Sequence, residues 1–344
     1  MPEVDTIQNI PFGSRFIGAN EPVLIIAEVG INHEGDVNLC SQMIEDAHEA
    51  GADSVKLQTI DADANYAAGS PSHELFGKSA LDQEEMARMF SLIRSLGMEP
   101  FTTVGDVATL EWVEALEPTA YKISSGLMTH APMLEHLLRT KRPLLLSTGM
   151  ADISQIDEAV RICENAQGGF GLFHCTSLYP APPETLNLSM IPYLKARYGH
   201  QVGFSDHSLG VHAAQLSVTS GAVMIEKHFS FDTSRPGFDH PISLDKKGFS
   251  DMVQAVRMAE VMRGSAPKVL SAEEINIAKR SHRVLVALKD VYPGEILSEK
   301  NLGFKRPLKA CEGVPPGEFK NYIGKIVTQE IPKDGIVTPG NTRD

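Results

Sequence analysis

Cysteine is scarce in this chain, and the few cysteines have no spacing typical of a structural or metal site. Cys40, Cys163, Cys175 and Cys311 lie far apart and form no C-x-x-C pair. A disulfide framework needs several paired cysteines, and a thiolate zinc site needs closely spaced ones. The sequence therefore predicts four free thiols in a reducing compartment.

Long apolar runs and an excess of positive charge are also missing. No apolar stretch approaches the roughly 20 residues that span a bilayer, and the acidic start has no cationic segment followed by an apolar one. The 31 Lys and Arg are outnumbered by 44 Asp and Glu, which gives a formal net charge of −13. Such a field repels nucleic acid and anionic membranes. We expect a cytoplasmic protein that binds neither, and whose anionic ligands need locally placed lysines.

What the sequence does contain is a regular alternation of short apolar runs and amphipathic helical stretches. Eight parallel βα units favour a closed (β/α)₈ TIM barrel. An open doubly wound sheet is the alternative, but no G-x-G-x-x-G follows any predicted strand. The eight predicted strands are residues 23–29, 54–59, 100–104, 120–125, 143–148, 170–175, 201–207 and 222–229.

The first helix shows how the helices are predicted. Asp36 can cap its N-terminus, and Leu39, Met43 and Ala47 recur at four-residue spacing. Gly51 can adopt the left-handed conformation that ends a helix.

The composition of the sequence and the length of its predicted elements change after the barrel. We assign residues 1–263 to the barrel domain, 264–283 to a polar linker and 284–344 to a small, mostly-β domain rich in Gly and Pro turns. A domain of about 60 residues is only marginally stable alone, so we expect it to pack against the barrel or a second subunit.

Polar residues alternate onto the inner face of several predicted strands. Period two puts Ser54, Lys56 and Gln58 on one face, opposite Val55 and Leu57. Buried charges are costly unless they are paired or bind a ligand, so their convergence favours a functional site at the C-terminal mouth of the barrel. The same parity places Glu28 on one face of the first strand, Ser205 and His207 on one face of the seventh, and Glu226 and His228 on one face of the eighth.

Two histidines and two lysines suggest what this site binds. His207 and His228 end neighbouring strands, roughly 4.8 Å apart in a sheet, so both imidazoles can reach one divalent ion. Lys56 and Lys122 can neutralise a phosphate and a carboxylate, with donors from the hydroxyls of Thr103, Ser125, Ser147 and Ser205. The alternatives are that the histidines are structural and that the lysines pair with Glu28 and Glu226.

These motifs resemble the sialic acid synthase (N-acetylneuraminate synthase) family, matched in order across nearly the whole chain. The segments are I-A-E-V-G-I-N-H-E-G from Ile26, V-K-L-Q-T from Val55, Y-K-I-S-S-G from Tyr121, L-S-T-G-M from Leu146, H-C-T-S-L-Y-P from His174, G-F-S-D-H-S from Gly203, I-E-K-H-F from Ile225 and R-P-G-F-D-H from Arg235.

The resemblance implies a barrel followed by an antifreeze-like (SAF) domain, in a domain-swapped homodimer. It also implies that phosphoenolpyruvate condenses with an N-acylated amino-sugar aldehyde, such as N-acetylmannosamine, to give a nine-carbon 2-keto acid and phosphate. Mn²⁺ or Mg²⁺ would bind His207 and His228. The implied catalytic residues are Glu28, Lys122, His207 and His228. Phosphoenolpyruvate would contact Lys56, Thr103, Lys122, Ser125, Ser147 and Ser205. The sugar would contact Gln58, Ser177, Tyr179, Asp239 and, from the partner subunit, Arg306.

Three positions depart from the family pattern. Leu127 stands where an acidic residue is usual, Ser177 where Asn is frequent, and Val104-Gly105 where Pro-Phe is common. All three are on the sugar side or its loops, so we expect altered sugar specificity and retained activity. Glu28 or His130 would then take the role of the missing acid, or the sugar lacks the feature it contacts.

Other functions also remain open at this point. A synthase of the legionaminic or pseudaminic type would use a 2,4-diacetamido-trideoxy hexose. A barrel lysine could instead form a Schiff base with pyruvate, as in aldolases. A non-catalytic carbohydrate- or ice-binding protein is the third alternative, although it has no need of a barrel mouth lined by Lys, Glu and His.

Overall fold

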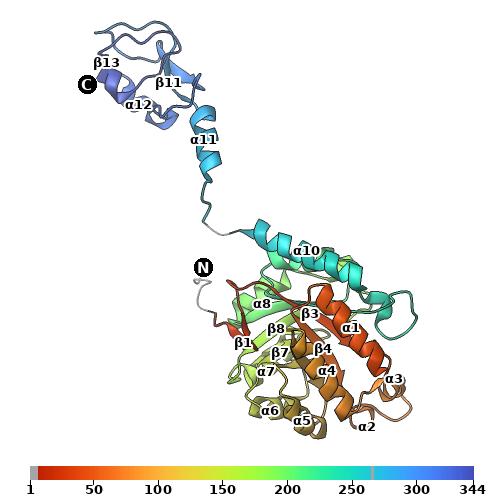
Figure 1. The fold of residues 1–344 in the computed structure, drawn as a ribbon. Coiled ribbons are helices and arrows are strands. Elements are labelled where there is room, and N and C mark those ends of the chain that lie inside the picture. Colours follow the sequence, from red (N-terminus) through yellow and green to blue (C-terminus); the bar gives the residue numbers. More distant parts are fainter. Residues whose placement is uncertain (1–6, 265–266) are drawn as a thin grey trace. The chain divides into compact units, whose positions relative to one another are not determined.

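The computed structural model describes residues 7–264 and 267–344, which belong to two compact units that divide after Gly264 (Figure 1). No helix within these residues is both long and apolar enough to cross a membrane. The two units are described separately below.

The first unit is a closed barrel of eight parallel strands, which confirms the predicted fold class and all eight predicted strands. Its order is β10-β3-β4-β5-β6-β7-β8-β9. The strands are β3 (Leu24–Gly30), β4 (Ser54–Thr59), β5 (Glu99–Val104), β6 (Tyr121–Ile123), β7 (Leu144–Ser147), β8 (Phe170–Cys175), β9 (Gln201–Asp206) and β10 (Met224–His228).

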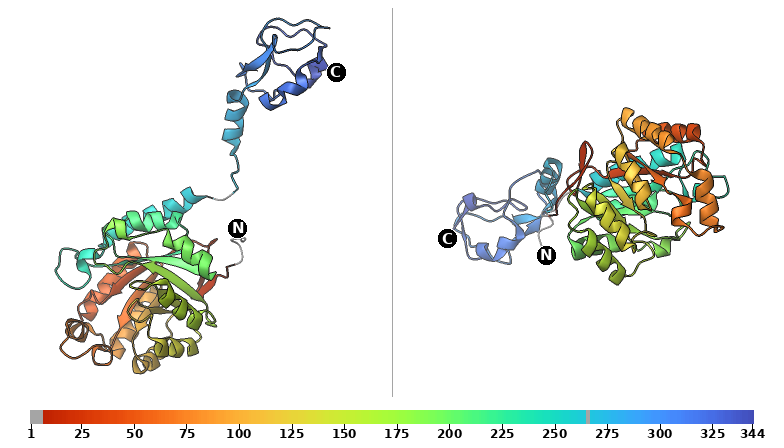
Figure 2. Two further views of the ribbon diagram at one scale, coloured as in Figure 1. Left: turned by 180° about the vertical axis from the view of Figure 1, so that it is seen from behind. Right: turned by 90° about the horizontal axis from the view of Figure 1, so that it is seen from below.

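Helices surround the strands as an outer layer (Figure 2). Helix α1 (Val37–Glu49) has the predicted N-cap, because the Asp36 side chain accepts hydrogen bonds from the backbone N–H groups of Asn38 and Leu39; Gly51 has a positive φ after its end. The others are α2 (Ala62–Asn65), α3 (Pro71–Ser79), α4 (Gln83–Ser95), α5 (Val107–Val113), α6 (Ala131–Arg139), α7 (Ile153–Cys163), α8 (Met190–Tyr198), α9 (His212–Thr219) and α10 (Lys246–Arg263).

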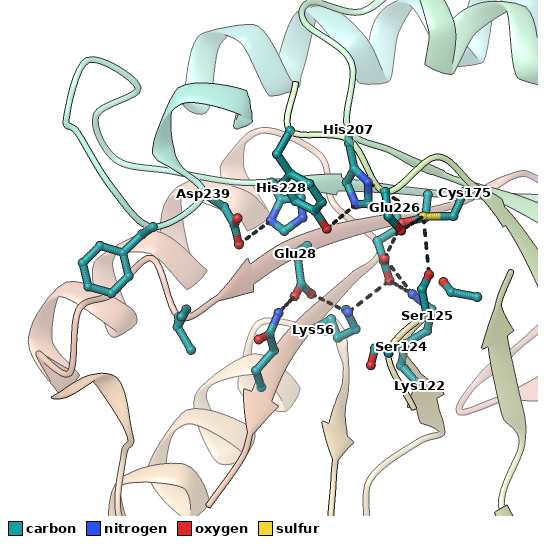
Figure 3. A pocket seen from close by; sticks show the side chains of 18 of the residues that line it. Glu28, Lys56, Lys122, Ser124, Ser125, Cys175, His207, Glu226, His228 and Asp239 are labelled. Atoms are coloured by element: carbon teal, nitrogen blue, oxygen red, sulfur yellow. Dashed lines mark hydrogen bonds and ion pairs between the residues drawn. The ribbon is translucent and has the colours of Figure 1, made fainter. Parts of the chain in front are cut away.

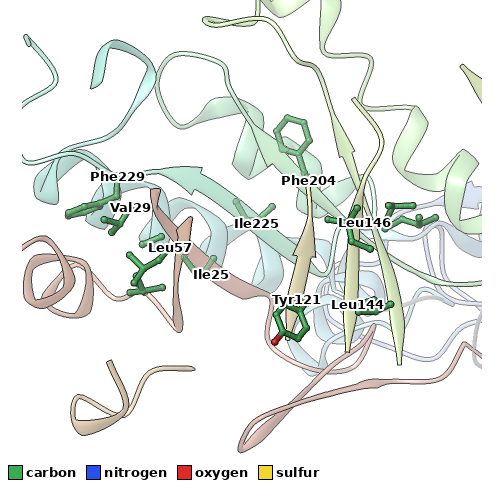
Figure 4. Close-up of a cluster of buried hydrophobic side chains, with 14 of the residues drawn as sticks. Ile25, Val29, Leu57, Tyr121, Leu144, Leu146, Phe204, Ile225 and Phe229 are labelled. Atoms are coloured by element: carbon green, nitrogen blue, oxygen red, sulfur yellow. The ribbon is translucent and has the colours of Figure 1, made fainter. Parts of the chain in front are cut away.

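Two apolar cores stabilise the barrel. The larger one lies between strands and helices and includes Ile25, Leu57 and Ile225 (Figure 4). The smaller one joins the inward-facing residues at the N-terminal ends of the strands to a hairpin, β1 (Ile10–Phe12) with β2 (Arg15–Ile17). Phe12 of this hairpin packs edge-on against Phe101, with ring centroids 5.5 Å apart. Because apolar side chains fill this part of the barrel, its inward-facing charges are confined to the other end.

Strand parity also separates a structural ion pair from the inner charges. Lys227 alternates with the inward-facing Glu226 and His228, so it points out of the barrel. Its Nζ lies 3.0 Å from Asp206 Oδ2, and both side chains are fully buried. Ser208 donates a hydrogen bond of 2.6 Å to the other oxygen of Asp206. This pair therefore stabilises the packing around the barrel and does not face a ligand.

The second unit is small and mostly built from turns and short antiparallel strands. Its core contains Leu285, Leu302 and Val337 among other buried apolar side chains. A helix lies within the segment predicted as a linker. The elements are α11 (Ala272–Ser281), β11 (Val284–Ala287) paired with β12 (Leu302–Lys305), α12 (Phe319–Tyr322), and β13 (Ile326–Val327) paired with β14 (Thr342–Arg343).

A buried histidine after β3 makes stability depend on pH. His33 is 2% exposed, and burial lowers its pKa from 6.5 to about 4. As pH falls from 6.5 towards 4, His33 becomes protonated in the unfolded chain but stays largely neutral in the folded chain. Unfolding should therefore become easier by about 2–3 kcal/mol over that interval. His33→Asn removes this titration, and urea unfolding at pH 7.5 and 4.5 measures the change.

His48→Asn, an exposed position on α1, is the matched control and should leave the pH dependence as in the parent protein. An equally steep loss of stability in His33→Asn would contradict the prediction.

Candidate active site

The predicted site residues of the barrel converge on one cavity of about 340 Å³ at the C-terminal ends of the strands (Figure 3). Thr103 is set apart, because it lines an adjoining side cavity of about 260 Å³. Arg306 belongs to the second unit, where it follows β12 and is exposed. The predicted residues that line the main cavity are Glu28, Lys56, Gln58, Lys122, Ser125, Ser147, Ser177, Tyr179, Ser205, His207, His228 and Asp239.

Four buried charges form the centre of the site. Lys122 Nζ lies 2.7 and 2.9 Å from the two carboxylate oxygens of Glu226. Their strands, β6 and β10, are on opposite sides of the barrel, so this pair spans its interior. Lys56 lies between them, 3.1 Å from Glu28 and 3.5 Å from Glu226. The pairing that we considered as a structural alternative is thus present, and it borders a cavity.

The two glutamates have opposite pKa shifts. Burial would raise the pKa of Glu226, but Lys122 and Lys56 outweigh it and hold this pKa well below 4.5. Burial, with a contribution from the negative charge of Glu226, raises the pKa of Glu28 to about 7 although Lys56 opposes the shift. Glu28 is therefore partly protonated near neutral pH, which leaves the four groups with a net positive charge. This charge favours an anionic ligand.

The two histidines meet beside this cluster, with ring centroids 5.3 Å apart. His207 Nδ1 lies 2.8 Å from the Thr176 carbonyl oxygen, which can only accept, so Nδ1 carries the proton. In the neutral imidazole, His207 Nε2 then accepts from the Tyr179 hydroxyl at 3.1 Å. On His228, Nδ1 is buried without a hydrogen-bond partner and lies 3.4 Å from Asp239 Oδ2.

This arrangement fits a divalent metal ion. A backbone carbonyl that fixes one histidine nitrogen and leaves the other with a lone pair is the usual support for a metal-binding imidazole. The unpartnered nitrogen of His228 is a second available ligand. Within residues 7–264 and 267–344, no three His, Cys, Asp or Glu side chains form a cluster that could hold a metal. Two histidines would leave the remaining coordination positions of a metal ion to oxygen ligands from water or substrate, as in an open site.

A glycine brings the hydroxyl groups close together. The N–H of Gly149 donates to Ser125 Oγ at 3.1 Å. A Cβ at Gly149 would lie 2.2 Å from Ser177 Oγ and 2.6 Å from Ser125 Oγ. The glycine in L-S-T-G-M therefore leaves room for the hydroxyls of two predicted ligand-binding serines in their present positions.

Several cavity residues were not among the predicted site residues. Strand parity had already placed Glu226 on the inner face as a possible partner of the lysines, but it was not assigned to the site; Cys175 obeys the same parity, so the period-two argument could have assigned it. Cys175 Sγ lies 3.8 Å from His207 Nδ1 and from Ser125 Oγ. Leu75 and Phe76 come from α3, and no spacing in the sequence signals that α3 covers the barrel mouth.

Two of the three departures from the family pattern line different cavities. Ser177 lines the main cavity and Leu127 lines the side cavity. His130 caps α6, where its Nδ1 accepts from the Met133 N–H at 3.2 Å, and it lines neither cavity. Of the two residues considered as replacements for the missing acid, Glu28 alone faces the site.

The fold and the site define a (β/α)₈ barrel with buried lysines and an open pair of histidines at its mouth. The NeuB family model matches residues 43–268, and the SAF domain model matches residues 282–341. The chain belongs to the NeuB family, which confirms the resemblance and the SAF assignment of the second unit.

The most informative relatives cover nearly the whole chain. An uncharacterized protein of Methanocaldococcus jannaschii is 36% identical over 95% of this chain and 96% of its own length. The N,N'-diacetyllegionaminic acid synthase of Legionella pneumophila is 33% identical over 91% and 93%. The crystal structure of an N-acetylneuraminic acid synthetase from Leptospira borgpetersenii has a TM-score of 0.76 at 32% identity, covering 80% of this chain and 97% of that chain.

Removing the Glu226 charge tests the central ion cluster. Glu226→Gln leaves two buried lysines without their shared counterion, so the free energy of unfolding should fall by about 3–5 kcal/mol. Glu158→Gln is the matched control, because Glu158 is exposed and 4.0 Å from Arg161; its effect should stay within about 0.5 kcal/mol. Denaturant unfolding compares them, and equal effects would show that the lysines do not depend on Glu226.

Proposed function

We propose that this protein condenses phosphoenolpyruvate with an N-acylated amino-sugar aldehyde, giving a nine-carbon 2-keto acid and phosphate. The main support is that two buried lysines, a row of serines and two histidines face one cavity. The names of the relatives support the same reaction class. The Legionella synthase is named for N,N'-diacetyllegionaminic acid and the Leptospira enzyme for N-acetylneuraminic acid.

The lysine side of the cavity suits the phosphate and carboxylate of phosphoenolpyruvate. Lys56 and Lys122 are held in place by Glu226 before the ligand arrives. Charge-assisted hydrogen bonds from lysine are strong, and hydroxyl donors fix the orientation of the anion. The hydroxyls proposed for this role are those of Thr103, Ser125, Ser147 and Ser205.

The other predicted residues of the cavity are proposed to hold the aldehyde. Gln58, Ser177, Tyr179 and Asp239 would contact the sugar, and a divalent ion bound at His207 and His228, Mn²⁺ or Mg²⁺, would polarise its carbonyl. C3 of phosphoenolpyruvate then attacks the aldehyde, and water adds at C2 before phosphate leaves with C–O cleavage. Glu28, with a pKa raised to about 7 by burial, can accept the proton of that water.

A Schiff-base mechanism is not favoured. Lys122, the lysine whose pKa burial lowers, is held by both oxygens of Glu226. The named relatives above are synthases. A purely carbohydrate-binding role has no use for a buried cluster of this kind.

Phosphate release tests the reaction directly. Purified protein with phosphoenolpyruvate, Mn²⁺ and a panel of hexosamine aldehydes headed by N-acetylmannosamine should release phosphate only when an aldehyde is present. EDTA should abolish the release, and His228→Gln should weaken it strongly, whereas the exposed His48→Gln should not. Covalent trapping of pyruvate by borohydride, with activity that survives EDTA, would instead support the aldolase.

A second prediction concerns the homodimer, in which we propose that Arg306 enters the partner's site. Lys122→Ala and Arg306→Ala should each impair turnover at low aldehyde concentration, the latter by roughly tenfold or more. A purified heterodimer of the two variants contains one intact site if Arg306 acts in trans. It should recover about half of the parental activity per dimer. No recovery would show that Arg306 acts within its own subunit, and an Arg306→Ala homodimer with parental activity would show that it does not act at all.

A further inference from the structure

The loop after β10 forms one wall of the main cavity. It runs from Phe229 to the start of α10, and its residues Phe238 and Asp239 both line the cavity. The base of the loop is closed next to the barrel, because Phe229 and Leu244 form a parallel bridge. This bridge does not reach Asp239, so other contacts must fix the position of that residue.

Phe238 has a backbone conformation that needs such support. Its φ is 47°, in the left-handed region that residues other than glycine adopt at a cost. A conformation of this kind persists only where the surrounding structure holds it. Both backbone groups of the next residue, Asp239, are bonded. Its N–H donates to Asn32 Oδ1 at 3.0 Å, and its carbonyl oxygen accepts from Ser243 Oγ at 2.6 Å.

Asn32 connects this part of the loop to the barrel. It lies in the turn after β3, where its own N–H donates to the Val29 carbonyl oxygen at 2.9 Å. The residue is 0% exposed, and its Nδ2 donates to the Phe229 carbonyl oxygen at 2.9 Å and to Ser243 Oγ at 3.0 Å. A carbonyl only accepts and a backbone N–H only donates, so these partners fix which way the amide points.

A second contact between the same two loops does not replace this one. Glu34 lies 2.7 Å from Arg235 and 3.1 Å from His240 Nε2. The Arg235 side chain is 45% exposed, and water and salt screen an ion pair of this kind. Glu34 also binds only side chains of the loop, whereas Asn32 binds the backbone of Asp239 itself. The buried amide is therefore the contact that decides where Asp239 lies.

We infer that Asn32 is a positioning residue for the aldehyde, because its bonds to the Asp239 N–H and to Ser243 direct the Asp239 carboxylate into the cavity. This carboxylate lies 3.4 Å from His228 Nδ1 (Figure 3). Asn32 itself does not line the cavity, so it acts through Asp239. The inference rests on the proposed function, in which Asp239 contacts the sugar.

Ser243→Ala tests this connection with a small change. It removes the hydroxyl that accepts from Asn32 and donates to Asp239. KM for the aldehyde should rise roughly tenfold, while kcat changes by less than about threefold. Phosphate release with phosphoenolpyruvate, Mn²⁺ and the aldehyde that the protein turns over fastest measures both constants.

Ser217→Ala is the matched control. Ser217 is also buried, and its Oγ donates to the Ala214 carbonyl oxygen at 2.8 Å within α9. The loss of this hydroxyl should leave both constants unchanged.

A double-mutant cycle separates positioning from general damage. In an Asp239→Ala background, Ser243→Ala should change the aldehyde KM by less than about twofold, because the carboxylate that it helps to place is gone. Asn32→Asp keeps the size and the acceptor but turns an oxygen towards the Phe229 carbonyl, so it should raise KM more than Ser243→Ala does. If Asn32→Asp does not fold, Ser243→Ala alone decides. The Kd for phosphoenolpyruvate, measured by calorimetry with Mn²⁺, should stay within about twofold in Ser243→Ala.

Three results would overturn the inference while leaving the proposed function intact. Ser243→Ala could keep the parental KM, it could raise KM by the same factor with and without Asp239, or it could weaken phosphoenolpyruvate as much as the aldehyde. Absence of phosphate release by the unaltered protein with every aldehyde would overturn the proposed function, and the inference with it.

Discussion

The compensation of buried charge at the barrel mouth is the constraint on which the site depends. Lys56 and Lys122 are nearly inaccessible to water, and the Glu226 carboxylate lies within 3.5 Å of each, which opposes the loss of charge that burial favours. Glu226 contacts both lysines and remains ionised, whereas the pKa of Glu28 is raised to about 7. The cluster is thus stable without a ligand and still has positive charge available for an anion.

The N-terminal end of the barrel contributes to stability, and the C-terminal end carries the polar groups of the candidate site. At the N-terminal end, Phe12 and Phe101 belong to an apolar core without charges. The next inward-facing layer replaces these side chains by lysine, glutamate, serine and histidine. A filled base supports the polar layer rigidly, which is how a barrel positions reactive groups within a fraction of an ångström.

In this chain, substitutions are expected to be tolerated better in the loops around the barrel mouth than in the charge cluster. The side cavity illustrates this, because its apolar residues come from the segments that flank α2, from α3 and from the loop after β6, and it shares Lys56 with the main cavity. Loops tolerate substitution better than buried ion pairs, since a change there leaves no unpaired charge. Sugar recognition can therefore change without loss of the proposed phosphoenolpyruvate site.

The sequence by itself determined the eight strands and which side chains point into the barrel. Both follow from local rules, because apolar runs and period-two alternation act over a few residues. The inward positions of Lys56, Lys122, His207 and His228 were predictable for this reason. The tertiary structure alone decided that Lys122 pairs with Glu226 across the barrel, that Thr103 lies in a separate cavity, and that Phe76 covers the mouth. These contacts join residues far apart in the chain, and they depend on barrel closure and loop packing, which no local pattern encodes.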